Sequence, residues 1–181
     1  MLGATRLGGA VGLALWIPVL LLGAGCASTS LSVTEDGFEH RRHDFTIGGA
    51  PAGWKRVDVE NATLAYRRGR PNTMTLQSRC GRPVATPQLM ARHLVIRLPD
   101  RELVAAGPIP VDGRNGWVQI FDTVQGDVSA RVKTVTVVAS DCTFDWVLGS
   151  TGDFDAAEVE FDAWWGTFRL GARYDEPEVG G

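Results

Sequence analysis

The sequence predicts an α+β domain in which helices pack on a single antiparallel sheet. Two observations carry this prediction. Several segments alternate apolar and polar residues with the period of two that is typical of strands, and turn-forming residues separate them. Two other segments repeat apolar residues every three to four positions, as helices do, and the order along the chain is strands, helix, strands, helix. A chain of 181 residues is long enough for one such domain.

Residues 1–25 are predicted to be a secretory signal. Arg6 supplies positive charge, the stretch from Leu7 to Gly25 has no charged residue, and small residues precede Cys26. This end resembles the bacterial lipobox, whose cysteine is acylated after cleavage. The resemblance implies that Cys26 carries a lipid anchor that fastens the chain to a membrane. A free cysteine in an uncleaved anchor, or cleavage nearby, remains an alternative.

The regions beside the domain are expected to be unstructured. Residues 26–43 are rich in Ser and Thr without apolar periodicity, which predicts a flexible tether. Residues 172–181 end in an acidic run and are predicted to be a disordered tail.

Ala27 resembles the outer-membrane sorting signal of Gram-negative bacteria. The expected location is therefore the cell envelope, on the periplasmic face of the outer membrane if the source is Gram-negative.

The domain, residues 44–171, is expected to open with strands. A short strand over 44–47 is followed by a loop rich in Gly and Pro that ends at Trp54. Residues 62–68 and 72–80 alternate, and the glycine and arginine between them indicate a hairpin.

A helix is predicted over residues 86–98. Thr86 can accept a hydrogen bond as N-cap, Pro87 suits the first helical position, and Pro99 marks the end.

Four further strands are predicted after this helix. The first of them contains Pro108 and Pro110, which confine it to an edge or an irregular path. A slip in the alternation at Lys133–Thr134 suggests a bulge. The expected strands cover residues 101–111, 117–124, 128–140 and 142–148.

The last predicted element is an aromatic-rich helix over residues 154–168. Asp153 and Asp155 stand at its start, where negative charge is favourable, and Gly171 is placed for a C-terminal cap. Its aromatic stripe is expected to pack on the sheet rather than to hold a cofactor.

Three cysteines suggest one disulfide. If the lipid uses Cys26, then Cys80 and Cys142 remain, and an even remainder in an exported chain predicts that they are bonded. Two buried free thiols are the alternative. A metal site is less expected because no CxxC pattern or nearby ligand pair occurs.

Two short stretches at the domain ends resemble the PsbP-like group, which includes the Ran-binding Mog protein and many bacterial lipoproteins. These are PAGW at 51–54 and FDAWWGTFRL at 161–170. The resemblance implies an αβα sandwich over residues 44–171. It also implies a protein that binds protein partners, because the group shares no catalytic site.

No motif predicts catalysis, a cofactor or a metal. The sequence has no Gly-x-Ser-x-Gly elbow, P-loop or HExxH pattern. His40 and His43 could ligate a cation, but two arginines separate them, so a solvated run beside the membrane is favoured. The acidic residues near the last helix lack the calcium-loop pattern and suggest an exposed acidic face.

Charge is uneven along the domain. Its first part is basic and its second part acidic, and Arg67, Arg68 and Arg70 form the densest basic cluster. A net charge of −3 together with export argues against nucleic acid as a partner. We therefore expect a non-enzymatic envelope lipoprotein that binds a protein partner at these arginines or assists an envelope complex. A carrier of lipid or of another small ligand is the alternative.

Overall fold

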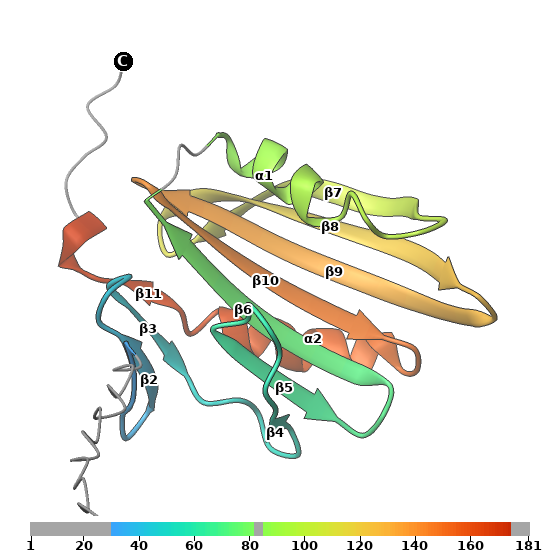
Figure 1. Cartoon of the computed structure of the whole chain (residues 1–181), viewed down its shortest axis with the longest axis horizontal. Coiled ribbons are helices and arrows are strands. Elements are labelled where there is room, and N and C mark those ends of the chain that lie inside the picture. The colour runs from blue at the N-terminus through green and yellow to red at the C-terminus, as the bar shows by residue number, and fades with distance from the viewer. Residues whose placement is uncertain (1–29, 82–84, 175–181) are drawn as a thin grey trace, which may run out of the picture.

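A seven-stranded antiparallel sheet forms the centre of the fold (Figure 1). The structure is a computed structural model that describes residues 30–81 and 85–174. The strands of this sheet, from one edge to the other, are β4 (Lys55–Arg56), β5 (Leu64–Arg68), β6 (Asn72–Cys80), β10 (Cys142–Ser150), β9 (Val128–Ala139), β8 (Arg114–Gln125) and β7 (Glu102–Val111).

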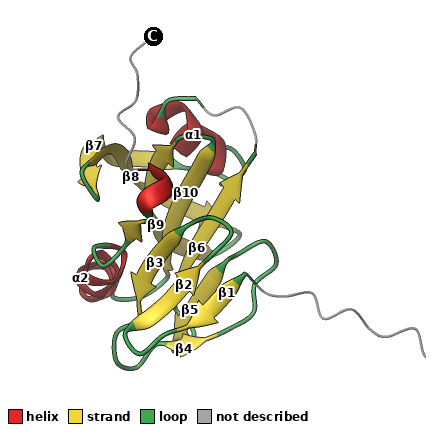
Figure 2. Cartoon of the chain, turned by 90° about the vertical axis from the view of Figure 1, so that its left-hand side faces the viewer, coloured by secondary structure: helices red, strands yellow, loops and turns green. Residues whose placement is uncertain are grey.

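A second, four-stranded sheet lies beside the first, so the expectation of a single sheet is wrong (Figure 2). Its strand order is β1, β2, β3, β11, which brings the two ends of the domain together as neighbours. The strands are β1 (Leu31–Val33), β2 (Gly37–His40), β3 (Phe45–Gly48) and β11 (Arg169–Leu170). The described part also contains α1 (Pro87–Leu94), α2 (Phe154–Trp165) and the 3₁₀ turn η1 (Ala172–Tyr174).

The two helices cover opposite faces of the large sheet. Gln119 of β8 donates a hydrogen bond to the Ala91 carbonyl of α1 at 2.7 Å. Lys133 of β9 contacts Glu158 of α2 at 2.8 Å. Gln119 is the cross-strand partner of Thr134, and successive residues of a strand point to opposite faces. The side chains of Gln119 and Lys133 therefore leave the sheet on opposite sides, and so do the helices that they contact.

The start of α1 follows its sequence signals, but its end does not. The Thr86 hydroxyl accepts the backbone N–H of Leu89 at 3.3 Å, and Pro87 is the first helical residue. The helix ends at Leu94, four residues before the predicted end. The apolar pattern continues because Val95 remains buried after the helix has stopped.

The main core lies between α2, the small sheet and the inner face of the large sheet. Phe144 and Trp146 of β10 face this core, and Phe161 and Trp164 of α2 pack into it. Phe168 makes ring contacts across the junction of the two sheets, with centroid separations of 5.3 Å to Phe45 of β3, 5.1 Å to Phe144 and 4.7 Å to Trp146. The aromatic stripe of the last predicted helix is thus structural.

Strand β7 forms one edge of the large sheet, as its prolines predict. Pro108 and Pro110 pair with Trp117 and Asn115 of β8, and neither proline has an N–H to offer. The outer side of this half of the strand therefore presents few donors, which protects it against pairing with another chain. The irregularity in the sheet lies between Leu103 and Ala105, not at Lys133–Thr134, where β9 pairs regularly.

The domain extends beyond the predicted boundaries at both ends. Residues 31–33 and 37–40, assigned to the tether, form β1 and β2. Ala172–Tyr174, assigned to the tail, forms η1, in which Tyr174 is buried. The predicted signal peptide, the tether residues 26–29 with Cys26, and the tail from residue 175 lie outside the described residues. Within residues 30–81 and 85–174, no helix is long and apolar enough to cross a membrane.

Candidate functional site

The disulfide is the first predicted site residue pair that the structure brings together. Cys80 ends β6 and Cys142 begins β10, and the antiparallel register places them directly opposite each other. Their sulfur atoms are bonded and their Cα atoms are 4.0 Å apart. The predicted pairing is confirmed, and it joins two central strands of the large sheet across a sequence separation of 62.

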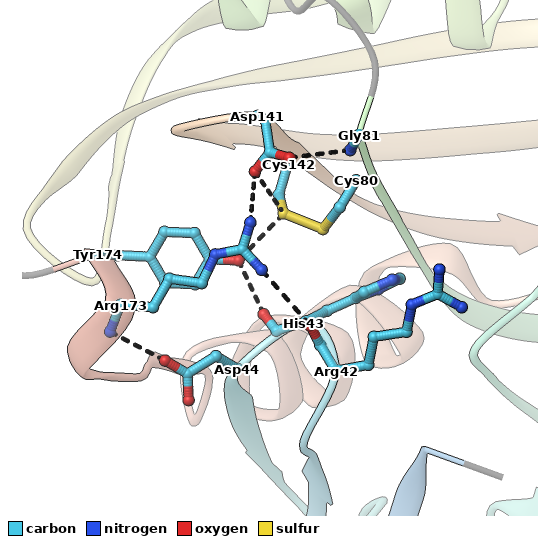
Figure 3. A network of polar contacts seen from close by, with 9 residues as sticks. All are labelled: Arg42, His43, Asp44, Cys80, Gly81, Asp141, Cys142, Arg173 and Tyr174. Atoms are coloured by element: carbon cyan, nitrogen blue, oxygen red, sulfur yellow. Dashed lines mark hydrogen bonds and ion pairs between the residues drawn. A yellow bond between two sulfur atoms is a disulfide. The ribbon is translucent and has the colours of Figure 1, made fainter. Parts of the chain in front are cut away.

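The C-terminal segment closes over this disulfide (Figure 3). The Tyr174 hydroxyl donates a hydrogen bond to the His43 carbonyl at 2.8 Å and lies 3.0 Å from Sγ of Cys142. The Arg173 guanidinium forms an ion pair with Asp141, the residue before Cys142. The first segment of the domain, the last segment and the disulfide are thereby held as one unit, which we call the clasp.

Asp44 and Gly171 fix the approach of the two ends within the clasp. The Gly171 N–H donates to the Asp44 carbonyl at 2.8 Å, and the Asp44 carboxylate accepts the Arg173 N–H at 2.9 Å. A Cβ atom at Gly171 would lie 2.0 Å from Oδ1 of Asp44, so a larger residue there would displace this carboxylate from its place beside Arg173. Gly171 was expected to cap the last helix, but α2 ends at Trp165 and Gly166 takes the cap position.

His40 and His43 belong to the folded domain rather than to a solvated run. Nδ1 of His40 accepts the backbone N–H of His43 at 3.0 Å, and Nε2 of His40 lies 2.9 Å from the Ser30 hydroxyl. The two imidazole rings stack with centroids 4.3 Å apart. Burial, with a smaller contribution from His43, lowers the pKa of His40 to about 4. Burial also lowers the pKa of His43.

We expect the free energy of unfolding to fall in mild acid because of these histidines. His40 is 6% exposed and is held in its neutral form, since Nδ1 already accepts a hydrogen bond. Its stabilising contribution is complete above the unfolded pKa of about 6.5 and is lost as the pH falls from there towards 4. We expect urea unfolding to show a decrease on the order of 2 kcal/mol between pH 7 and pH 4.5. His40→Gln should flatten this decrease, and an identical pH profile in that variant would contradict the assignment.

Ser78 and His43 form a hydroxyl–imidazole pair on the inner face of the sheet. Nδ1 of His43 lies 2.8 Å from the Ser78 hydroxyl, which is also 2.9 Å from the hydroxyl of Thr63. Ser78 is buried, and in the described part of the chain no carboxylate is hydrogen-bonded to His43. The pair therefore differs from a nucleophile–base–acid arrangement, in which a carboxylate orients the histidine and the hydroxyl faces a substrate.

The predicted arginine cluster divides into two parts. Arg68 points toward α2, where its guanidinium pairs with Glu160 and lies 5.3 Å from the ring centroid of Trp54. Nε1 of Trp54 donates to the same carboxylate at 2.7 Å. Arg68 therefore contacts Glu160 and Trp54, and these contacts stabilise the turn formed by PAGW. Arg67 and Arg70 are exposed and remain candidates for contact with a partner.

Lys55 is a basic residue of this region that sequence reasoning missed. It lies on β4 directly opposite Arg67 of β5, and both residues are exposed. The two cations leave the sheet on the face opposite Arg68, because Arg67 and Arg68 are consecutive in a strand. Lys55 and Arg67 are twelve positions apart in the chain, so their proximity becomes evident only from the pairing of β4 with β5.

A groove of about 490 Å³ lies between α1 and the β7–β8 hairpin. Its basic lining includes Arg92 and His93. Leu89, Ile96 and Leu103 are 42%, 64% and 56% exposed, which is high for large apolar side chains that share one groove. Its apolar lining includes Leu89, Ile96, Leu103, Trp117 and Phe121. Its size falls within the range of small-ligand pockets.

Comparison with known proteins identifies the fold. No protein-family model matches the sequence, and no curated protein matches it. Among solved structures, cyanobacterial PsbP (CyanoP) from Synechocystis sp. PCC 6803 superposes with a TM-score of 0.56 at 15% identity, over 81% of this chain and 95% of that one. The fold is PsbP-like. LpqN of Mycobacterium tuberculosis, described as involved in cell envelope biogenesis, superposes with a TM-score of 0.51 at 13% identity, over 70% of this chain and 83% of that one.

The PsbP-like fold confirms the architecture implied by the PAGW and FDAWWGTFRL stretches. Trp54 of the first stretch contacts Arg68 and Glu160, and Phe168 of the second stretch joins the two sheets. At 13–15% identity these likenesses show the fold alone.

Proposed function

We propose that this protein is an envelope lipoprotein, fastened to a membrane through an acylated Cys26, that acts by binding a protein partner rather than by catalysis. The observation that carries the proposal is the position at which the fold begins. Ser30 is already part of the domain, because its carbonyl accepts the Arg41 N–H at 2.9 Å and its hydroxyl contacts His40. A chain four residues long reaches about 14 Å at most. An acyl chain on Cys26 would therefore hold the domain against the membrane surface.

Two further observations support this function. The fold is shared with LpqN, whose description places that protein in envelope biogenesis. Ser78 of the Ser78–His43 pair is buried, and the pair lacks a carboxylate partner within the described residues. Both observations support a binding role.

The anchor is tested by metabolic labelling with an alkyne-tagged fatty acid. We expect the wild type to take up the label and Cys26→Ala to lose it, together with its membrane fraction. The double variant Cys80→Ala/Cys142→Ala is the matched control, since it removes two cysteines and should keep the label. Equal labelling of wild type and Cys26→Ala would overturn the anchor.

The partner is tested by cross-linking in cells, followed by mass spectrometry of protein and lipid in the same sample. A protein that is captured by the wild type and lost with Cys26→Ala supports a binding module at the membrane. Recovery of a stoichiometric lipid without any protein would overturn it.

Carriage of a small amphipathic ligand is the second candidate function, and the groove between α1 and β7–β8 favours it. The aromatic floor of Trp117 and Phe121 would suit an apolar tail, and Arg92 would suit an anionic group. Native mass spectrometry of protein purified from its own membranes tests this. A bound lipid that is displaced by Ala106→Trp, a substitution that fills the groove, would support carriage, and unliganded protein would count against it.

A further inference from the structure

Two like charges face each other without compensation at the β4 edge of the large sheet. Lys55 and Arg67 are direct cross-strand partners, and both side chains are exposed. Such partners have Cβ atoms about 5 Å apart, and like charges at that separation destabilise a sheet. A protein that keeps this arrangement gives up stability at the position.

The residues around the pair do not neutralise it. Among residues 30–81 and 85–174, neither Lys55 nor Arg67 has a hydrogen bond or an ion pair from its side chain. The next partner of Arg67 is Thr73 of β6, which is uncharged. On this face of the sheet, α1 covers β8 and β9, so within residues 30–81 and 85–174 no helix covers the strands at the β4 edge. Arg70, in the turn that follows β5, is a third cation whose side chain has no hydrogen bond or ion pair with a described residue.

The backbone that carries the pair is anchored by the neighbouring residues. Arg68 follows Arg67 in β5 and is fixed on the inner side by Glu160 and by the ring of Trp54. Trp54 precedes Lys55 in the chain, and its Nε1 donates to the same Glu160 carboxylate. The two residues that flank the cations are therefore tied to one point on α2. The backbone positions of Lys55 and Arg67 are thereby fixed relative to each other, so the spacing at which the two cations are presented is set before binding.

We infer that Lys55, Arg67 and Arg70 form a docking site for an acidic segment of a protein partner. The inference rests on the proposed function in so far as the partner belongs to the envelope. A carboxylate bound between Lys55 and Arg67 would remove the repulsion that the free domain carries. Stability given up in the free protein is thereby recovered on binding.

A protein segment fits this site better than a membrane surface does. The chain carries a net charge of −3, and Asp58 and Glu60 follow β4 directly. An extended anionic bilayer would approach these carboxylates together with the cations, and the overall charge would oppose it. A short acidic segment would approach the three cations over a smaller area than a bilayer.

The first test needs no partner and measures thermal unfolding of the full chain in detergent. Lys55→Glu and Arg67→Glu each turn repulsion into attraction, so each should raise Tm by about 2–4 °C at low salt. The double variant Lys55→Glu/Arg67→Glu restores like charges and should return to the wild-type Tm. Arg97→Glu, an exposed reversal outside the site, is the control and should leave Tm unchanged. A fall in Tm for both single variants would overturn the inference.

The second test measures binding of a synthetic hexaglutamate peptide to the same proteins. We expect Lys55→Glu and Arg67→Glu each to weaken binding about tenfold, Arg97→Glu to leave it unchanged, and high salt to abolish it. Equal binding by all variants would overturn the site. Inorganic phosphate and phosphatidylglycerol vesicles are the comparison probes, and a preference for either over the peptide would also overturn it. These assays do not depend on acylation of Cys26, so failure of the anchor and failure of the docking site are distinguishable.

Discussion

Replacing both Cys80 and Cys142 by alanine is expected to lower the free energy of unfolding by about 4 kcal/mol. The bond closes a loop with a sequence separation of 62, and chain-entropy arithmetic for a loop of that length gives this value. The loss is a large share of the stability of an ordinary domain. Urea unfolding at pH 7, followed by tryptophan fluorescence, measures it.

The clasp gives this prediction a second readout. Tyr174 lies 3.0 Å from Sγ of Cys142, so the C-terminal segment should exchange its amide hydrogens faster once the bond is absent. Wild-type protein in reducing agent should reproduce the double variant. A change below about 1 kcal/mol in both samples would show that the bond adds little to the fold.

Phe168→Ala is expected to destabilise the domain by about 3–5 kcal/mol. Phe168 is 1% exposed and contacts rings from β3 and β10, so the substitution leaves a cavity where the two sheets meet. Phe168→Leu fills part of that space and should cost less. Val159→Ala on the exposed side of α2 is the control, because Val159 is 71% exposed. Chemical denaturation of the three variants checks the order, and equal losses for Phe168→Ala and Val159→Ala would contradict it.

The large sheet could be predicted because its signals are local. Residues 72–80 alternate clearly and form β6, and Thr86 with Pro87 marks the start of α1. The disulfide followed from counting cysteines. The misplaced bulge has a physical cause: Lys133 interrupts the alternation but is buried, because Glu158 and Asp162 of α2 neutralise it at 2.8 Å each. An apparently polar position can therefore face the interior when another element supplies its counter-charge.

The small sheet could not be predicted because its strands depend on distant partners. Residues 31–33 and 37–40 are short and lack a clear alternation, and β3 gains its second neighbour only from Arg169–Leu170. The residues that pair, Thr46 with Arg169 and Phe45 with Leu170, are too far apart in the chain for a local sequence pattern to show it. The division of the arginine cluster, in contrast, could be predicted from the sequence. Arg67 and Arg68 are consecutive in a strand, so their side chains point to opposite faces of the sheet. The proximity of Lys55 to Arg67 could not be predicted, because it depends on the register between β4 and β5. The sequence does not show that register, since the length of the connecting turn is not known from it.

The pairing of β3 with β11 also has a consequence for the order of folding. A chain is made from its N-terminus, so the residues of β1, β2 and β3 are available before residues 169–174. Until then β3 presents a free edge that could pair with another chain. Premature termination before residue 169 would leave that edge permanently open. The pairing of Arg169–Leu170 with β3 therefore completes the small sheet and covers this edge.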